Sequence, residues 1–404
     1  MRILHVEKFY PVQAGVGSYV RSLRKLQQTG GHEVFQFGCV GADGPSDMPR
    51  YRDFASSRSL ADLWRMMHNQ GAADKLERFL RIHPVDVAHL HNVYHHLTPS
   101  ILPVLARHGV GIVMTLHDYR LVCPTKYFFI EQLPGSGQCM RCQPNRFFHA
   151  AGRRCAGFGG GGLAIESFVQ RFWRRYFRWV DKFICPTPFM RRVLLAVGLP
   201  RSKAVVVPNP VEAIDLPEKA AQAPDELLYV GRLSPEKAPQ LLLEVAASRS
   251  DLRVVIVGDG PLEAQLRQQV ARRSLANVTI AGRVDHDRLG EHYAAASAVV
   301  LTSRWMENSP QTMLEAMLAG RVVIAPDQPP LRGWVQDGVT GRLYEPGNAD
   351  ALTGVADEVL ADAAGCENMA RAAKELVARE HQPARVAGRI EDLYREAMGR
   401  CALR

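Results

Sequence analysis

The sequence predicts an α/β protein built from two doubly wound domains, and three observations support this fold class. The chain has 404 residues, more than one ordinary hydrophobic core accommodates. Short apolar runs alternate with helical patterns along most of its length, which is typical of βαβ units in mostly parallel sheets. A stretch rich in Pro, Ala and Glu, residues 208–224, separates two such series and is expected to be a linker.

The first domain is expected at residues 1–207. Its predicted strands are MRILHV, EVFQFG, DVAHLH, GIVMTLHD, KFICPT and AVVVPNP, with helices near 18–28, 164–180 and 188–196. The periodicity lapses in an insert at 120–160 that is rich in Cys, Gly and Arg and is expected to belong to this domain.

The second domain is expected at residues 225–384. Five strands are predicted in it, with helices between them: ELLYVG, LRVVIVGDG, NVTIAG, AVVLTS and RVVIAP. The last stretch, 385–404, is amphipathic and is expected to form a helix that returns to the N-terminal domain. Two such sheets are expected to face a central cleft, since ligands of open α/β sheets bind at the carboxyl ends of the strands.

Composition and charge limit the partners. No apolar run approaches the ~18 residues of a membrane span, and the first residues enter a strand without a signal-peptide layout, so a cytoplasmic protein is expected. Residues 1–210 hold 28 Lys and Arg against 13 Asp and Glu, whereas residues 211–404 hold 22 against 28. The basic first half suggests an anionic partner such as lipid headgroups or a lipid-linked phosphate. Nothing resembles a nucleic-acid reading element, so no nucleic acid is expected.

The most informative motif is SRWMENSPQTMLEAM at residues 303–317, directly after a predicted strand. Ser309 is a favoured N-cap and Pro310 fits the first helical position, so a helix is predicted to start there. Its N-terminus would attract a diphosphate. Glu307 and Glu315 lie on either side of that point and can accept hydrogen bonds from sugar hydroxyls. The alternative is a capped surface helix that carries ordinary glutamates.

Two further loops agree with this interpretation. In VGRLSPEK, residues 230–237, Arg232 and Lys237 lie between a strand and a helix, where two cations can reach a pyrophosphate. In the next strand end, VGDGP, the glycines Gly258 and Gly260 let a ligand approach the backbone.

Together these residues resemble the retaining GT-B glycosyltransferases called glycosyl transferases group 1, or family 4. The resemblance covers nearly the whole chain and also includes Gly15-Val16-Gly17, Gly31-His32-Glu33-Val34, Leu116-His117-Asp118 and Val207-Pro208-Asn209-Pro210-Val211. Ala14 and Ala238 stand where the family usually has Gly. The insert near 123–155 is not typical, although a subset resembles it with Cys-Pro after the His-Asp strand.

The resemblance implies transfer of a sugar from a UDP- or GDP-sugar to a hydroxyl acceptor, with retention, in polysaccharide, glycolipid or glycosylated natural-product biosynthesis. Arg232 and Lys237 would bind the pyrophosphate, Glu307 the transferred sugar and Glu315 the ribose. His117 would sit over the reacting centre on the acceptor side, together with Asp118. The resemblance implies further donor contacts from Gly15, Gly17, Gly231, Gly258, Gly260, Val284, Ser309, Pro310, Gln311 and Thr312.

No Asp-x-Asp pair stands directly at the end of a predicted strand, so no divalent cation is expected to be needed for catalysis. Two other classes compete with the transferase. A GT-B epimerase or phosphorylase would need acid/base carboxylates in the cleft or a pyridoxal-phosphate lysine, and neither signature is visible. A non-catalytic membrane-binding scaffold would have no need of the intact Arg232, Lys237, Glu307 and Glu315.

Four of the eight cysteines lie in the insert: Cys123, Cys139, Cys142 and Cys155. The two-residue spacing between Cys139 and Cys142 is that of many zinc sites, and a structural Zn²⁺ would hold together a loop with few apolar residues. The alternatives are unmetallated thiols, a disulfide or an iron–sulfur cluster.

The helix expected near 164–180 alternates aromatic and basic residues: Phe168, Arg171, Phe172, Trp173, Arg174, Arg175, Tyr176, Phe177, Arg178 and Trp179. Such a helix suits an anionic membrane interface. The alternative is a domain helix whose aromatic residues fill the core while its arginines are solvated.

Overall fold

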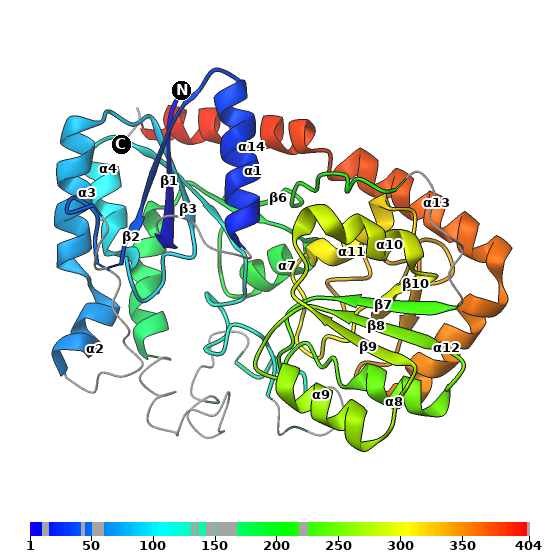
Figure 1. The fold of residues 1–404 in the computed structure, drawn as a ribbon. Coiled ribbons are helices and arrows are strands. Elements are labelled where there is room, and N and C mark those ends of the chain that lie inside the picture. The colour runs from blue at the N-terminus through cyan, green and yellow to red at the C-terminus, as the bar shows by residue number, and fades with distance from the viewer. Residues whose placement is uncertain are drawn as a thin grey trace. The chain divides into compact units, whose positions relative to one another are not determined.

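The computed structural model describes residues 1–9, 16–41, 45–50, 60–130, 133, 137–142, 149, 168–217 and 225–401. The chain forms two compact units, coloured by residue number in Figure 1. The N-terminal unit comprises Met1–Lys126, Arg141–Pro210 and Pro383–Arg404, and the C-terminal unit comprises Tyr127–Met140 and Val211–Gln382.

The N-terminal unit contains a parallel six-stranded sheet of order β2-β1-β3-β4-β5-β6. Its strands are β1 Arg2–Phe9, β2 Glu33–Cys39, β3 Val87–His91, β4 Gly111–Thr115, β5 Lys182–Cys185 and β6 Ala204–Val206. All their carboxyl ends lie at one edge, because the strands are parallel.

Helices cover both faces of this sheet: α1 Val16–Thr29, α2 Leu60–Met67, α3 Gln70–Ile82, α4 Leu102–Arg107, α7 Pro188–Ala196 and α14 Pro383–Cys401. In Figure 1, α1 (blue) and α14 (red) lie together over one face, and both contribute to a core cluster with residues of β1, β3 and β4. The two layers are very close at Gly111, where an added Cβ would lie 3.0 Å from the backbone nitrogen of Met398. The last helix of the chain is therefore part of the N-terminal core.

The C-terminal unit contains a second parallel six-stranded sheet of order β12-β11-β10-β7-β8-β9. The strands are β7 Glu226–Val230, β8 Arg253–Val257, β9 Val278–Gly282, β10 Ala298–Val300, β11 Val322–Pro326 and β12 Arg342–Tyr344. The sequence predicted the first five of these strands. The sixth, β12, has only three residues and therefore no readable alternation.

The helices of this unit are α8 Leu241–Ser248, α9 Glu263–Arg272, α10 Leu289–Ala295, α11 Gln311–Leu318, α12 Ala349–Ala361 and α13 Ala363–Glu380. Alternate strand residues enter two separate core clusters: Leu227 and Tyr229 belong to one, and Leu228 to the other. Since successive side chains of a strand point to opposite faces, helices pack on both faces of the sheet, as the sequence predicted for a doubly wound domain.

Two predicted segments differ from the structure. The insert was assigned wholly to the N-terminal domain, but Tyr127–Met140 makes its contacts in the C-terminal unit. The helix expected near 164–180 is described from Phe168 onward, and its last part, Arg174–Trp179, is a 3-10 helix. Burial of Trp173 and Phe177 accounts for much of its aromatic character, as the alternative of a domain helix predicted.

Candidate active site

The predicted donor residues of the C-terminal unit lie on loops that leave one edge of its sheet. The loop of residues 231–237 follows β7, the turn of residues 258–260 follows β8, and the loop of residues 301–310 joins β10 to α11. Because β10, β7 and β8 are parallel neighbours, their carboxyl ends bring the three loops together.

Lys237 and Glu307 form the centre of this group. The Lys237 Nζ atom lies 2.5 Å from Glu307 Oε1, and the Glu307 side chain is only 3% exposed. Glu307 Oε1 also accepts a hydrogen bond from the hydroxyl of Ser303. The two side chains assigned to pyrophosphate and sugar are thus in direct contact, although 70 residues separate them.

The loop that carries Glu307 is anchored by its backbone. The amide of fully buried Gln328 accepts a hydrogen bond from the Glu307 N–H (3.1 Å) and donates one to the Ser303 carbonyl (2.7 Å). The Arg304 N–H donates to the carbonyl of Glu236 at 2.9 Å. Gln328, which lies two residues after the end of β11, was not among the residues predicted from the sequence.

The glycines predicted in these loops are required by close packing. An added Cβ at Gly258 would lie 1.9 Å from the carbonyl oxygen of Gly231, and one at Gly260 would lie 2.4 Å from that of Leu233. Both glycines also have positive φ, 139° and 153°. Only Gly fits at these two positions, so the two loops are pressed against each other. Ala238, which stands where the family usually has Gly, adopts a φ of 48°.

Helix α11 begins one residue later than the sequence predicted. Pro310 occupies the N-cap with extended φ and ψ, and no side chain caps the helix, so the prediction of Ser309 as N-cap and Pro310 as first helical residue is wrong. A residue with extended backbone angles is not part of the helix, and proline, which has no N–H, loses no hydrogen bond at this position. The first amides of an α-helix have no carbonyl partners within the helix, so the N-terminus of α11 is suited to an anion.

Three polar groups beside this centre are buried without a hydrogen-bond partner in the described part of the chain. They are the hydroxyls of Ser234 and Ser309 and the indole nitrogen of Trp305. The Trp305 ring also lies 5.2 Å from Lys237 Nζ. Buried polar groups are rarely left without partners, so these three are candidates for contacts with a polar ligand.

Glu315 lies within α11 and is held by two side chains that the sequence analysis missed. The hydroxyl of Tyr293 donates to Glu315 Oε2 at 3.0 Å, and His286 Nε2 lies 3.3 Å from Oε1. The hydrogen bond to Glu315 raises the pKa of His286. The carboxylate is 12% exposed and therefore still accessible to a ligand.

The remaining predicted donor residues are spread more widely. Arg232 is exposed beside the Gly231 turn, and its carbonyl accepts a hydrogen bond from Tyr229. Val284 is half-buried and packs against the C-terminal core. Gly17 is buried at the start of α1, whereas Gly15 lies outside the described residues.

A segment of the insert braces the Glu307 loop within the C-terminal unit. The Met306 N–H donates to the carbonyl of Tyr127 at 3.2 Å, and the Tyr127 ring packs edge-on against Trp305. The guanidinium of Arg304 lies over the ring of Phe129. The lack of periodicity in the insert gave no signal of these contacts.

The predicted acceptor-side residues lie in the N-terminal unit, after the carboxyl end of β4. His117 Nε2 lies 3.0 Å from His91 Nδ1. Because burial lowers the pKa of His117 to about 3, this imidazole is neutral near pH 7. Asp118 Oδ1 accepts a hydrogen bond from the backbone N–H of Arg120 at 2.9 Å.

Three of the four cysteines of the predicted zinc site lie among the described residues. Cys155 lies outside them, and Cys139 belongs to the C-terminal unit whereas Cys123 and Cys142 belong to the N-terminal unit. Cys123 and Cys142 are buried and Cys139 is half-buried.

Structural zinc at the four cysteines stays a prediction, which elemental analysis can test directly. Elemental analysis of protein purified without chelator should find about one zinc per chain, and Cys142→Ser should lose it. The exposed-glycine variant Gly354→Ala serves as a control that keeps the metal. A metal-free protein with four titratable insert thiols would contradict the zinc assignment.

Buried histidines of the N-terminal unit should make its stability dependent on pH. Burial lowers the pKa of His5 to about 4 and places those of His89 and His91 well below their ordinary value. The unfolded chain binds these protons near pH ~6.5 and the folded chain does not. The free energy of unfolding is therefore highest above that pH. It falls as the pH drops toward 4, by about 1.4 kcal/mol per pH unit for each histidine. Urea midpoints that are equal at pH ~7.5 and ~5 would contradict this.

Comparison with protein families gives two adjoining matches. Residues 14–213 match the model described as Glycosyltransferase Family 4, and residues 212–376 match the one described as Glycosyl transferases group 1.

Among curated relatives, alpha-D-kanosaminyltransferase from Streptomyces kanamyceticus is 30% identical over 42% of this chain and 45% of its own length. Lipopolysaccharide 1,2-N-acetylglucosaminetransferase from Salmonella typhimurium is 29% identical over 52% of this chain and 61% of its own. The matching stretches thus span about half the length of these relatives. Alpha-monoglucosyldiacylglycerol synthase from Streptococcus pneumoniae is 24% identical over 85% of this chain and 75% of its own.

The same fold occurs in solved structures. Sucrose-phosphate synthase from Thermosynechococcus elongatus superposes with a TM-score of 0.74 at 18% identity and covers 99% of this chain and 100% of that chain. HepE from Anabaena, solved in complex with UDP and glucose, has a TM-score of 0.66 at 18% identity and covers 97% of this chain and 98% of its own. The two family models match adjoining parts of the chain, and the chain folds into the two parallel sheets of the GT-B fold. The chain therefore belongs to the group 1, family 4 glycosyltransferases.

Proposed function

We propose that this protein transfers a sugar from a nucleotide sugar to a hydroxyl acceptor, with retention at the anomeric carbon, and that the C-terminal unit binds the donor. The observation that carries the proposal is the ion pair between Lys237 and Glu307, which lies on the loop that leads into α11. Negative charge develops on the β-phosphate as the glycosidic bond breaks. A lysine and a helix N-terminus stabilise that charge, which lowers the barrier.

The roles of the other residues follow from their surroundings. Arg232 is exposed and available to the diphosphate, while Glu315, oriented by Tyr293, accepts hydrogen bonds from the ribose. The buried hydroxyls of Ser234 and Ser309 donate to phosphate or sugar oxygens. In this proposal turnover needs no divalent cation, since Lys237, Arg232 and the helix amides supply the positive charge.

The names of similar proteins point to two classes of nucleotide-sugar donor. HepE was solved with UDP and glucose, and one relative from Mycobacterium tuberculosis is named a GDP-mannose-dependent alpha-mannosyltransferase, 30% identical over 46% of this chain. We infer a UDP- or GDP-sugar donor. We infer that the acceptor binds to the N-terminal unit, where His117 and Asp118 follow β4.

A donor panel tests the proposal. The full chain is incubated with UDP- and GDP-sugars, and both the thermal midpoint and the release of nucleotide are followed. The true donor should raise the midpoint by mass action and be slowly hydrolysed without acceptor. A panel in which no nucleotide sugar shifts the midpoint or is consumed would refute the transferase. Conversion of the donor into an epimer, seen by NMR, would instead favour the epimerase.

We also infer that the N-terminal unit binds an anionic membrane surface. Among the described residues, no helix is long and apolar enough to cross a bilayer. Two large aromatic side chains are nevertheless exposed in this unit, Trp64 (55%) and Phe168 (60%). The Trp64 ring contacts Phe172, over which the guanidinium of Arg175 lies at 4.4 Å. Exposed aromatic rings next to arginines are typical of an interfacial surface.

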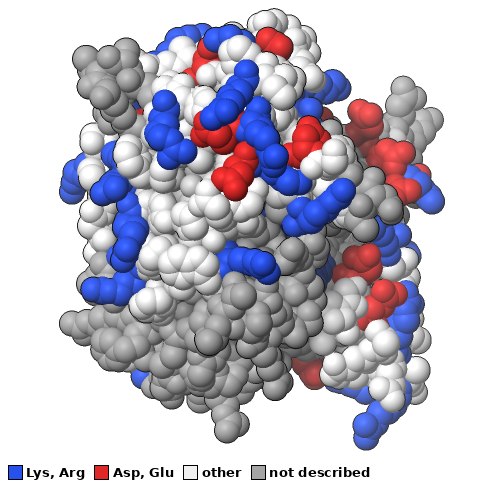
Figure 2. All heavy atoms as spheres, turned by 90° about the vertical axis from the view of Figure 1, so that its left-hand side faces the viewer, with Lys and Arg blue, Asp and Glu red and all other residues white. Residues whose placement is uncertain are grey.

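Charge elsewhere on this unit is more balanced. On the face shown in Figure 2, basic side chains are scattered and several lie beside acidic ones. Glu77, for example, pairs with Arg107 and His108. The membrane proposal therefore rests on the segment around Phe168 and not on the overall charge.

A vesicle experiment tests this surface. The chain should co-sediment with anionic vesicles at low salt and detach at high salt. Arg171→Glu/Arg175→Glu should abolish binding, since both side chains are exposed, whereas Arg174 is partly buried and unsuitable. The control Arg371→Glu/Arg379→Glu makes the same charge change on α13. Equal binding of both double variants would contradict the assignment.

A further inference from the structure

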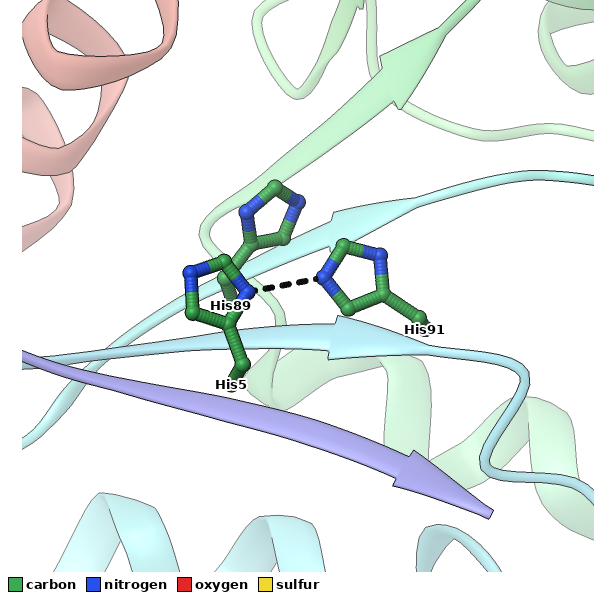
Figure 3. Close-up of side chains that lie close together, drawn as sticks. All are labelled: His5, His89 and His91. Carbon is green, nitrogen blue, oxygen red and sulfur yellow. Dashed lines mark hydrogen bonds between the residues drawn. The ribbon is translucent and has the colours of Figure 1, made fainter. Parts of the chain in front are cut away.

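Four histidines of the N-terminal unit lie close together beneath α1 and α14. His5 lies on β1 and pairs in register with His89 on β3, and His91 follows two residues later on the same face. Figure 3 shows the three rings projecting from β1 and β3, with His5 and His91 joined by a hydrogen bond. All three are fully buried. The fourth, His117, follows β4.

Hydrogen bonds connect these rings in a line that ends at an amide. His117 Nε2 lies 3.0 Å from His91 Nδ1, and His91 Nε2 lies 3.1 Å from His5 Nδ1. His5 Nε2 then lies 2.7 Å from the side-chain oxygen of Gln27 on α1. The line thus runs from the predicted acceptor-side residue into the core.

The line continues from the other end of the same amide. The nitrogen of Gln27 donates to the Tyr394 hydroxyl on α14 at 3.0 Å, and that hydroxyl lies 2.6 Å from His89 Nδ1. His89 Nε2 lies 2.7 Å from the hydroxyl of Thr115. Every ring nitrogen of His5, His89 and His91 therefore has a partner.

The rings are arranged for hydrogen bonds and not for a shared metal ion. The ring nitrogens of His5, His89 and His91 lie within 4.8 Å of one another, close enough for a three-histidine site. However, the rings of His5 and His91 are nearly parallel (7°), with centroids 5.4 Å apart. This centroid separation equals the 3.1 Å between the two nitrogens plus the distance from each ring centroid to its nitrogen. The two nitrogens therefore point directly at each other. Ligands of one tetrahedral ion would instead converge on a point beside that line.

The protons of this network can be counted. Burial keeps the imidazoles neutral by lowering the pKa values of His5, His89, His91 and His117. A neutral imidazole has one N–H and one acceptor nitrogen, so a ring that donates on one side must accept on the other. The position of a single proton therefore determines all the others along the line.

We propose that the Gln27 amide sets the tautomer of His117 through His5 and His91. Since the amide oxygen accepts from His5 Nε2–H, His5 Nδ1 must accept from His91 Nε2–H, and His91 Nδ1 must accept from His117 Nε2–H. This leaves His117 Nδ1 without a hydrogen, as an acceptor. Gln27, His5 and His91 are positioning residues in this arrangement.

The other branch follows the same direction. The Tyr394 hydroxyl accepts from the Gln27 amide and donates to His89 Nδ1, so His89 also carries its hydrogen on Nε2. All four rings are thus Nε2–H tautomers. Turning the Gln27 amide over would reverse every bond and make all four Nδ1–H. The network consequently has two consistent proton arrangements, and Gln27 selects one.

The consequence for catalysis rests on the proposed function. An acceptor nitrogen at His117 Nδ1 can receive a hydrogen bond from the acceptor hydroxyl and so orient that hydroxyl for attack. The reversed arrangement would present an N–H there instead, which orients a hydroxyl with its oxygen toward the ring.

Nuclear magnetic resonance of chain labelled with ¹⁵N-histidine tests the tautomers without reference to activity. Among the imidazoles that stay neutral at pH ~5, the ring whose signals disappear in His117→Gln should carry its hydrogen on Nε2. A neutral Nδ1–H ring at His117 would overturn the proposal.

A variant tests the role of Gln27 itself. Gln27→Met removes the acceptor of His5 Nε2–H, so the line reverses and His117 becomes an Nδ1–H ring. The control Gln28→Met makes the same change at the exposed neighbouring position of α1 and should leave the signals unchanged. An unchanged His117 tautomer in folded Gln27→Met would overturn the proposal.

Turnover provides the second readout. With the donor identified above, Gln27→Met should lower kcat at least tenfold while donor KM stays within twofold. Correct tautomers in a chain that consumes no nucleotide sugar would refute the proposed function but leave the network intact. Wild-type kcat in a Gln27→Met chain whose His117 tautomer has reversed would refute the link to catalysis.

Discussion

Lys237→Met should lower kcat about 10²- to 10³-fold, corresponding to ~2.7–4 kcal/mol of lost transition-state stabilisation. Donor KM should change much less, because the charge on the leaving phosphate is greatest in the transition state. The measurement is steady-state turnover with the donor identified by the panel. Lys374→Met, a matched change on an exposed residue of α13, should keep wild-type kcat.

A purely structural role for Lys237 can be separated from this one. Lys237 neutralises Glu307, and removing one partner of a buried pair typically costs about 3–5 kcal/mol of stability. The double variant Lys237→Met/Glu307→Gln removes both charges and should recover much of the stability without recovering turnover. Near-wild-type kcat in the folded single variant would show that Lys237 does not contact the phosphate.

Gly258→Ala should destabilise the C-terminal unit by about 2–5 kcal/mol, since it combines an overpacked contact with a strained backbone. Its Cβ would lie 1.9 Å from the Gly231 carbonyl, and its φ of 139° is unfavourable for any residue with a side chain. Because Gly258 packs against the loop that carries Arg232 and Lys237, the proposed donor cations, affinity for the nucleotide should fall as well. Urea unfolding and nucleotide titration measure the two effects.

The control for this prediction is Gly354→Ala in α12. An added Cβ there meets nothing within 4 Å, and alanine is favoured in a helix, so stability should rise by up to ~1 kcal/mol. If Gly258→Ala were as stable as Gly354→Ala, the tight packing of the two donor loops would be wrong.

The sequence predicted where these loops lie, because each motif directly follows a strand. Parallel strands put their carboxyl ends at one edge, so the sequence alone was enough to assign Lys237 and Glu307 to one site. The start of α11 was misplaced by one residue, since Pro310 is compatible both with the first helical turn and with the extended N-cap that it adopts. Helix boundaries are decided by such local choices.

The histidine network could not have been predicted. The alternation in HLH on β3 shows that His89 and His91 share a face, but their partners are distant in the sequence. Tyr394 lies 305 residues from His89, and only the packing of α14 against the sheet brings them together. Gln328 was missed for the same reason, because it acts through the backbone of a loop 21 residues away.

Titration calorimetry of the full chain with UDP and GDP tests most directly the claim that the C-terminal unit holds the donor. One of the two nucleotides should bind with a stoichiometry of one. Arg232→Met and Glu315→Leu should each weaken that binding at least tenfold, or ~1.4 kcal/mol, whereas Lys374→Met should leave it unchanged. Binding of neither nucleotide, or equal affinity in all four proteins, would contradict the assignment of the donor site.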